Sequence, residues 1–109
     1  MTKKIYHTKN LNLDGNGVSR TAVRGVLIDS GNILLIHSPV NGDYKFPGGG
    51  LEAAETHSAA LKREIAEECG LRVKAVDCFM GMITEYDSAE EPEKDFFKMD
   101  SYYYKCTAE

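Results

Sequence analysis

The sequence lacks the features that identify several classes of protein. Its three cysteines, Cys69, Cys78 and Cys106, are odd in number and form no Cys-x-x-Cys pair. This usage predicts reduced thiols in a cytoplasmic protein rather than a disulfide framework or a zinc knuckle. No apolar run approaches the roughly 18 residues of a membrane-spanning helix. The basic residues that follow Met1 precede no apolar stretch, so we expect no signal peptide.

The sequence also contains fewer positively charged residues than negatively charged ones. Thirteen Lys and Arg against seventeen Asp and Glu give a formal net charge of −4, and the pI is near 5.4. Duplex nucleic acid and anionic membranes attract basic surfaces, so neither is an expected partner of this acidic chain. A local basic pocket for a phosphorylated small molecule is compatible with the same balance.

The composition is that of a single globular domain. The chain has 109 residues, of which 42% are hydrophobic and 28% charged. This mixture argues against disorder, a collagen-like repeat and a coiled coil, and no internal repeat is visible. A chain of this size buries roughly 60–70% of its unfolded surface, so one hydrophobic core needs no disulfide staples.

Strand patterns come first along the chain. We expect a short edge strand around Ile5, followed by turn residues at 14–17. Residues 21–29 and 33–37 are apolar or β-branched and are joined by Ser30-Gly31-Asn32, which predicts a β-hairpin. A short piece at 44–46 lies between two predicted loops, the second of which contains residues 47–50.

One helix is predicted from about Thr56 to Cys69. Leu61, Ile65 and Cys69 recur every four residues and share one face, and Gly70 stands where a left-handed C-cap would end the helix. Residues 71–84 and 96–107 favour strands on either side of a charged loop, so the whole order predicts a mixed sheet with a packed helix. Because the last strand is uncovered, we expect either a partner chain or a missing C-terminal part, and favour the second.

Three carboxylates on the predicted helix repel one another. Glu64, Glu67 and Glu68 fall within an arc of roughly 100°, and like charges at these spacings destabilise a helix. Arg63 cannot neutralise all three, whereas a divalent cation that takes oxygen ligands could. Each feature alone is typical of a solvated surface or a flexible loop. The acidic helix directly after a glycine-rich loop instead favours a site for a metal–phosphate complex.

The spacing of these residues resembles the signature of the Nudix (MutT-like) hydrolases. Their pattern, G-x5-E-x7-R-E-u-x-E-E-x-G-u with u a bulky aliphatic residue, is matched at every defined position by Gly49, Glu55 and Arg63-Glu64-Ile65-Ala66-Glu67-Glu68-Cys69-Gly70-Leu71. Phe46-Pro47-Gly48 resembles the usual lead-in, and Glu52 stands where many members carry a glutamate. Many members of the family have glycine at the position of Ala54, and we expect the alanine to stiffen the loop.

The resemblance implies a fold and an activity. The fold is an α/β/α sandwich with a mixed β-sheet, forming one Nudix domain over residues 1–109 that lacks its C-terminal part. The activity is hydrolysis of a phosphoanhydride bond, by water attack on phosphorus, in a nucleoside-diphosphate-linked substrate. A nucleoside triphosphate, ADP-ribose or a nucleotide sugar would be such a substrate. The cofactor it implies is Mg2+ or Mn2+.

The same resemblance implies roles for the signature residues. Glu64 and Glu68 would be metal ligands, with the carbonyl oxygen of Gly49 as an additional one. Glu67 would be a further ligand or the base that deprotonates the attacking water. Arg63 and Glu55 would pair and orient the carboxylates. Gly48 and Gly50 would support the loop.

Other candidates are weaker. Arg20, Arg24 and Lys45 could meet substrate phosphates, and Tyr44 or Phe46 could stack on a base, but surface charge and ordinary packing are the alternatives. The three histidines, His7, His37 and His57, stand at no recognisable ligand spacing and are not expected in catalysis.

Two other functions compete with that of an enzyme. One is a ligand-sensing domain of the same fold, and the other is an oligomeric structural domain whose acidic helix binds calcium. The uncovered last strand favours pairing with a second copy, as in a homodimer. Which nucleotide derivative would be the substrate is not encoded in any motif we recognise.

Overall fold

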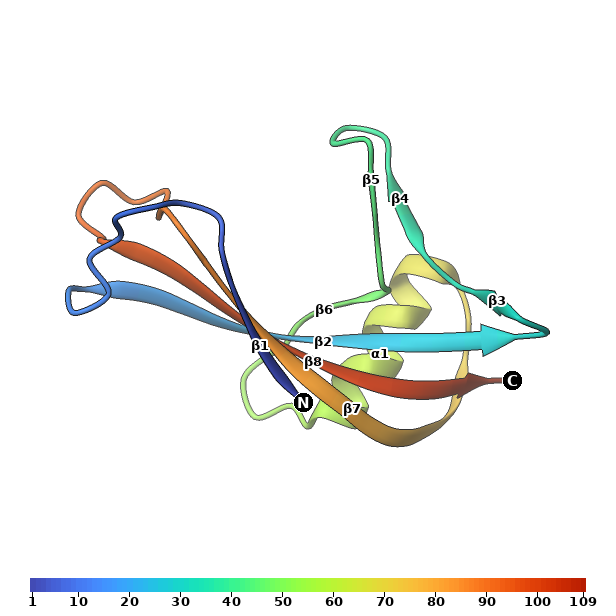
Figure 1. Cartoon of the computed structure of the whole chain (residues 1–109). Coiled ribbons are helices and arrows are strands. Elements are labelled where there is room, and N and C mark those ends of the chain that lie inside the picture. The colour runs from blue at the N-terminus through green and yellow to red at the C-terminus, as the bar shows by residue number, and fades with distance from the viewer.

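One mixed sheet forms most of the molecule. The computed structural model describes all residues 1–109, and its main sheet has the strand order β1-β7-β8-β2-β3, with β6 paired to β2 (Figure 1). The elements are β1 (Thr2–Tyr6), β2 (Gly17–Asp29), β3 (Asn32–Ile33), β4 (Ile36–Ser38), β5 (Asp43–Lys45), β6 (Gly48–Gly50), α1 (His57–Cys69), β7 (Val73–Asp87) and β8 (Phe96–Ala108).

The sheet combines both kinds of strand pairing. β1 pairs parallel with β7, and β2 pairs parallel with β8, whereas β7 and β8 form a long antiparallel hairpin. That hairpin contains three register shifts, between Val73 and Ala75, Val76 and Cys78, and Phe79 and Gly81. Such bulges increase twist and bend a strand, so the sheet is curled. The predicted fold class, a mixed sheet with a helix packed on it, is confirmed.

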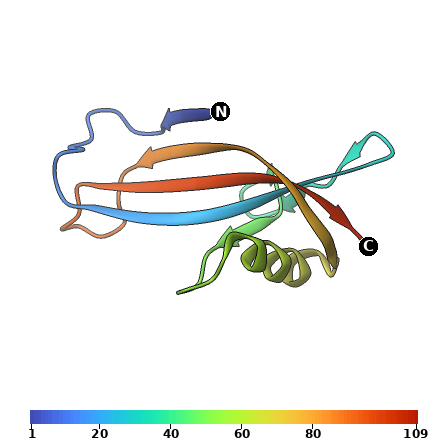
Figure 2. The same ribbon diagram turned by 90° about the horizontal axis from the view of Figure 1, so that it is seen from below.

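Helix α1 covers one face of this sheet (Figure 2). The hydroxyl of Thr56 accepts a hydrogen bond from the Ala59 N–H at 3.1 Å. At the other end Gly70 has φ 69°, and its N–H donates to the Ala66 carbonyl. Both caps and both ends of the helix are therefore as predicted. The core between helix and sheet consists of Val23, Leu27, Ala60, Leu61, Ile65, Val73 and Cys106.

Side-chain alternation gives β2 and β8 two distinct faces. Val23 and Leu27 of β2 lie in the core beside α1. Arg24 pairs in register with Tyr103 of β8, so both belong to the opposite face. That face carries no helix in residues 1–109 (Figure 2).

Two local predictions were wrong. Residues 33–37 do not form one strand: the hairpin turns at Ser30 and Gly31, but β3 ends at Ile33. The chain then leaves the sheet and forms an arm in which β4 pairs with β5 (Figure 1). Residues 48–50, predicted as loop, form strand β6 on β2. β6 pairs with residues 22–24 of β2, on the same edge on which β3 pairs with Ile28 and Asp29.

The start of β2 also differs, at Gly17 instead of residue 21, because its first residues pair with β8. The expected edge strand around Ile5 is β1. α1 is the one helix of the structure, and it falls short of the length needed to cross a membrane.

Candidate functional site

Arg63 is the centre of a hydrogen-bond network that joins α1 to the segment before it. Its Nε donates to Glu55 Oε2 at 2.7 Å and its Nη2 to Glu55 Oε1 at 2.9 Å, a two-bond pairing that suits the planar guanidinium. Nη2 also donates to the Gly50 carbonyl at 3.1 Å. Nη1 reaches Glu64 at 2.9 Å and Glu67 at 3.4 Å. One side chain therefore fixes the segment and two helix carboxylates together.

This network keeps its members charged. The hydrogen bonds from Arg63, together with one from the Glu52 N–H, lower the pKa of Glu55 to about 2. Hydrogen bonds to Glu55 and Glu64 raise the pKa of Arg63 above its usual range. Only 13% of the Glu55 side chain and 24% of the Arg63 side chain are exposed to solvent. The ion pair implied by the resemblance is thus present and is mostly shielded from water.

The absence of side chains in β6 brings its backbone against the helix. A Cβ on Gly49 would lie 2.5 Å from Cδ of Glu64, and one on Gly48 would lie 1.9 Å from the Val23 carbonyl oxygen. Gly48 also has φ 144°, which other residues rarely adopt. Its N–H donates to Glu68 at 2.8 Å. β6 therefore contacts two of the three signature glutamates of the helix.

The three glutamates differ in their surroundings. The Glu64 side chain is 18% exposed, while that of Glu67 is 60% exposed and is held by one long bond to Arg63. No three acidic, histidine or cysteine side chains gather around a single point. Their donor atoms, with the Gly49 carbonyl, are all oxygens, which suits a hard cation such as Mg2+ or Mn2+. The ligand atoms are therefore of the type that such an ion binds, although the side chains do not converge on a single point.

A pocket of about 390 Å³ adjoins β6 on the sheet face opposite α1. Its lining includes Arg24, Tyr44, Lys45 and Phe46, four of the five residues predicted as weaker substrate contacts. Tyr103 lines it as well and meets Phe46 edge to face, with ring centroids 5.7 Å apart. The pocket thus offers both cationic and aromatic surface.

Gly48 connects this pocket to the helix. Arg24 Nη1 donates to the carbonyl of Gly48 at 3.1 Å and to that of Phe46 at 3.2 Å. The N–H of the same Gly48 donates to Glu68. A ligand bound beside Arg24 would therefore be separated from Glu68 by one residue of β6.

Arg20, the remaining weaker candidate, lies elsewhere. It lines a second hollow with Glu52 and His57, and a third near the loop that joins β7 to β8. The imidazole Nδ1 of His57 is 2.6 Å from the Tyr104 hydroxyl, which gives this histidine a packing and hydrogen-bonding role.

The sequence reasoning missed the histidine and the two carboxylates of the pocket beside β6. They are His7, which directly follows β1, and Glu85 and Asp87 of β7. His7 Nε2 lies 2.9 Å from Glu85 Oε1. These two residues are 78 positions apart, and the parallel pairing of β1 with β7 that joins them leaves no short motif.

Comparisons with known proteins bear on the family. The chain is 41% identical over 54 residues to a MutT-like protein from Streptomyces ambofaciens, covering 49% of this chain and 35% of that protein. It is 38% identical over 69 residues to an ADP-ribose pyrophosphatase from Methanocaldococcus jannaschii, covering 61% and 40%. The chain therefore spans well under half the length of these curated relatives.

A solved structure and a family model extend the agreement. The structure of a mutator MutT protein from Bacillus halodurans has a TM-score of 0.70 at 27% identity, over 83% of this chain and 57% of that one. The model of the NUDIX domain matches residues 18–109, from β2 to the end of β8. This match includes the helix, β6 and the network around Arg63, and the chain belongs to the Nudix family.

Proposed function

We propose that this domain hydrolyses a phosphoanhydride bond in a nucleoside-diphosphate-linked compound, and that it depends on Mg2+ or Mn2+. The observation that carries the proposal is the Arg63 network, which joins β6, Glu55 and two glutamates of a complete Nudix signature. Relatives named as a MutT-like protein and an ADP-ribose pyrophosphatase support the same class of substrate.

Each residue of the site has a proposed task. Glu64, Glu68 and the Gly49 carbonyl would hold the metal, which when bound lowers the pKa of water and neutralises charge on phosphoryl oxygens. Arg63 would position Glu64 through its bond at 2.9 Å. Glu67 is the most exposed of the acids bonded to Arg63 on α1 and is held by one long bond. We assign it the removal of the proton from the attacking water.

The pocket beside β6 would bind the nucleotide. Arg24 and Lys45 supply positive charge there, and they would contact phosphate groups close to Gly48. Tyr44 and Phe46 supply flat apolar surface for a base.

The proposal is tested by a substrate panel and one acidic variant. The panel contains nucleoside triphosphates, ADP-ribose and nucleotide sugars, with Mg2+ or Mn2+, and the measured product is a nucleoside monophosphate. Glu67→Gln is expected to lower kcat by about 100-fold or more, the usual contribution of a general base. Glu93→Gln, at an exposed position of the loop before β8, is the matched control and is expected to change nothing.

Three outcomes would contradict parts of the assignment. If no compound were turned over with either metal, the proposal that this domain is a hydrolase would be rejected. Tight nucleotide binding without turnover would favour a ligand-sensing domain instead. Equal kcat values for the Glu67→Gln variant and the unmodified protein would show that Glu67 is not the general base.

A further inference from the structure

The pocket beside β6 carries opposite charges on different strands. Arg24 comes from β2, whereas Glu85 and Asp87 come from β7. β8 lies between these two strands, so the charges stand about 10 Å or more apart. Tyr103 of β8 lies close to both charges. Burial raises the pKa of the Tyr103 hydroxyl, the positive charge of Arg24 lowers this pKa, and the negative charge of Glu85 raises it. The pocket therefore has a cationic end beside Gly48 and an acidic end beside β1.

Of the two carboxylates at the acidic end, Glu85 is the less compensated. Asp87 Oδ1 accepts from the Thr8 hydroxyl and from the Ser88 N–H, and these bonds lower the pKa of Asp87. Glu85 has His7 as its one side-chain partner, at 2.9 Å through Oε1. The Glu85 side chain is 37% exposed, so its second oxygen can accept a hydrogen bond from a ligand in the pocket.

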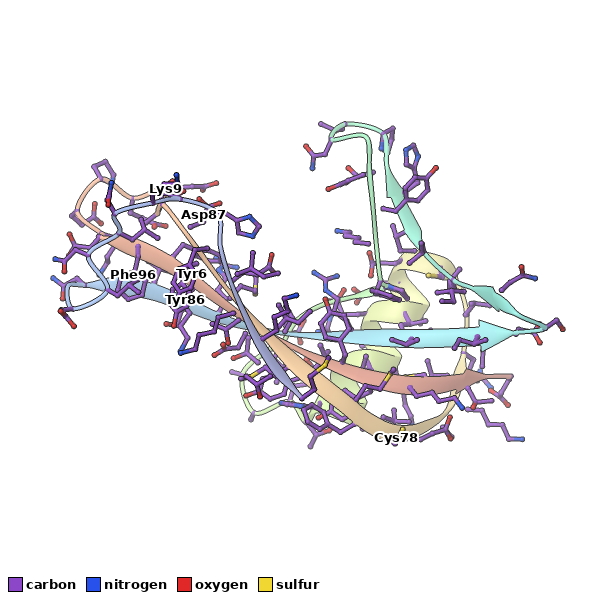
Figure 3. The ribbon with its side chains drawn as sticks, viewed as in Figure 1. Tyr6, Lys9, Cys78, Tyr86, Asp87 and Phe96 are labelled. Atoms are coloured by element: carbon purple, nitrogen blue, oxygen red, sulfur yellow. The ribbon has the colours of Figure 1, made fainter.

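The strand β1 holds this acidic end in place. The N–H of His7 donates to the Tyr86 carbonyl at 2.9 Å, and Tyr6 stacks on Tyr86 with ring centroids 5.0 Å apart. Figure 3 shows Tyr6 and Tyr86 side by side, with Asp87 near the start of the loop that follows. Because these contacts fix β1 to β7, His7 is fixed beside Glu85 and limits where that carboxylate can point.

We propose that Glu85 is a specificity-determining residue that accepts a hydrogen bond from the amino group of a nucleobase. The inference rests on the proposed function, in which the phosphates lie at Arg24 and Lys45. Tyr103 pairs with Arg24, and Met99 pairs with Glu85, so these two side chains line the stretch between the two ends and offer apolar surface to a flat ring. A carboxylate is an acceptor only, so it attracts an amino group and repels a carbonyl oxygen at the same position.

The proposal predicts discrimination within pairs of bases of equal size. Cytosine and uracil differ by an amino group in place of a carbonyl, and so do adenine and hypoxanthine. We expect kcat/KM for CTP over UTP, or for ATP over ITP, to favour the amino-bearing member by about tenfold, the modest value suited to a half-exposed contact. Glu85→Gln can both donate and accept, and is expected to reduce that ratio to about one to threefold.

The kinetic signature separates specificity from chemistry. In the Glu85→Gln variant we expect KM for the amino-bearing substrate to rise and kcat to stay unchanged. Glu93→Gln serves again as the control and is expected to keep the full preference. Equal kcat/KM values within each nucleotide pair for the unmodified protein, or an unchanged preference in Glu85→Gln, would overturn the role of Glu85. Neither result would contradict the proposed hydrolase activity.

Binding without turnover tests the inference independently of the proposed function. Calorimetry with CMP, UMP, AMP and IMP, without added metal, is expected to show tighter binding of the amino-bearing nucleotide and loss of this difference in Glu85→Gln. That result in a protein that hydrolyses nothing would keep the role of Glu85 and reject the enzyme. Failure of all four nucleotides to bind, or equal binding within both pairs, would overturn the role of Glu85.

Discussion

The missing side chain of Gly49 decides where the Glu64 carboxylate can lie. An added Cβ would stand 2.5 Å from Cδ of Glu64 and displace it. We expect Gly49→Ala to weaken Mn2+ binding and turnover by about 10- to 100-fold, as loss of a ligand-positioning contact does. Isothermal titration with Mn2+ and kcat measurements check this.

The neighbouring glycine provides the control. A Cβ on Gly50 would meet nothing closer than the Thr21 carbonyl oxygen at 3.9 Å. Gly50→Ala should therefore keep metal affinity and turnover within about twofold. Equal losses in both variants would show that β6 needs flexibility, and would reject a specific role for the space above Glu64.

Single residues of the site were predictable to different degrees. The partnership of Arg63 with Glu55 followed from the signature because the two lie within one short segment of fixed spacing. Arg24 and Lys45 are weak candidates from the sequence, and they line one pocket because the segment from β5 to β6 returns to the edge of β2. His7 and Glu85 could not be paired from the sequence, since a parallel strand pairing over 78 positions joins them.

Helix α1 illustrates an element whose limits are encoded locally. The hydroxyl of Thr56 caps the first turn, and the repulsion between the three glutamates works against the helix. We expect Thr56→Ala to lower the free energy of unfolding by about 1 kcal/mol, and Thr56→Ser to retain most of it. Urea unfolding followed by circular dichroism measures both. An unchanged midpoint in Thr56→Ala would mean that packing of Leu61 and Ile65 alone sets the helix.

The strands were less predictable than the helix, for a physical reason. A helix satisfies its backbone hydrogen bonds within one segment, whereas a strand needs a partner that the sequence does not name. Residues 48–50 carry glycine, which disfavours strands, yet the edge of β2 recruits them as β6. On the same edge of β2, β3 ends at Ile33 and the chain then forms the β4–β5 arm.

At the scale of the whole molecule, the Glu55–Arg63 pair links stability to pH. The pKa of Glu55 falls from 4.5 to about 2 on folding. Its contribution is therefore fully present above pH 4.5 and is lost as the pH drops towards 2. Thermal melts between pH 6 and pH 2.5 should show a decline below pH 4.5 that is smaller in Glu55→Gln. A decline of equal size in both proteins would place the acid sensitivity elsewhere.

Metal binding should also stabilise the whole fold, because the proposed metal ligands come from two elements. Glu64 and Glu68 lie on α1, and Gly49 lies on β6, which pairs with β2. A metal that binds only the folded chain stabilises it by about 2.7 kcal/mol at 100 times its Kd. We expect Mn2+ or Mg2+ to raise the melting temperature of the unmodified protein, and Glu68→Gln to lose most of that rise.

This experiment also separates the enzyme from a structural metal domain. The amide oxygen of Glu68→Gln can still accept from the Gly48 N–H, so the metal-free variant should melt close to the unmodified protein. A melting shift from calcium alone, with no hydrolysis under any metal, would make the acidic helix a structural site. A metal-induced melting shift of equal size in Glu68→Gln would show that the ion binds outside the signature, and it would reject the proposed set of ligands.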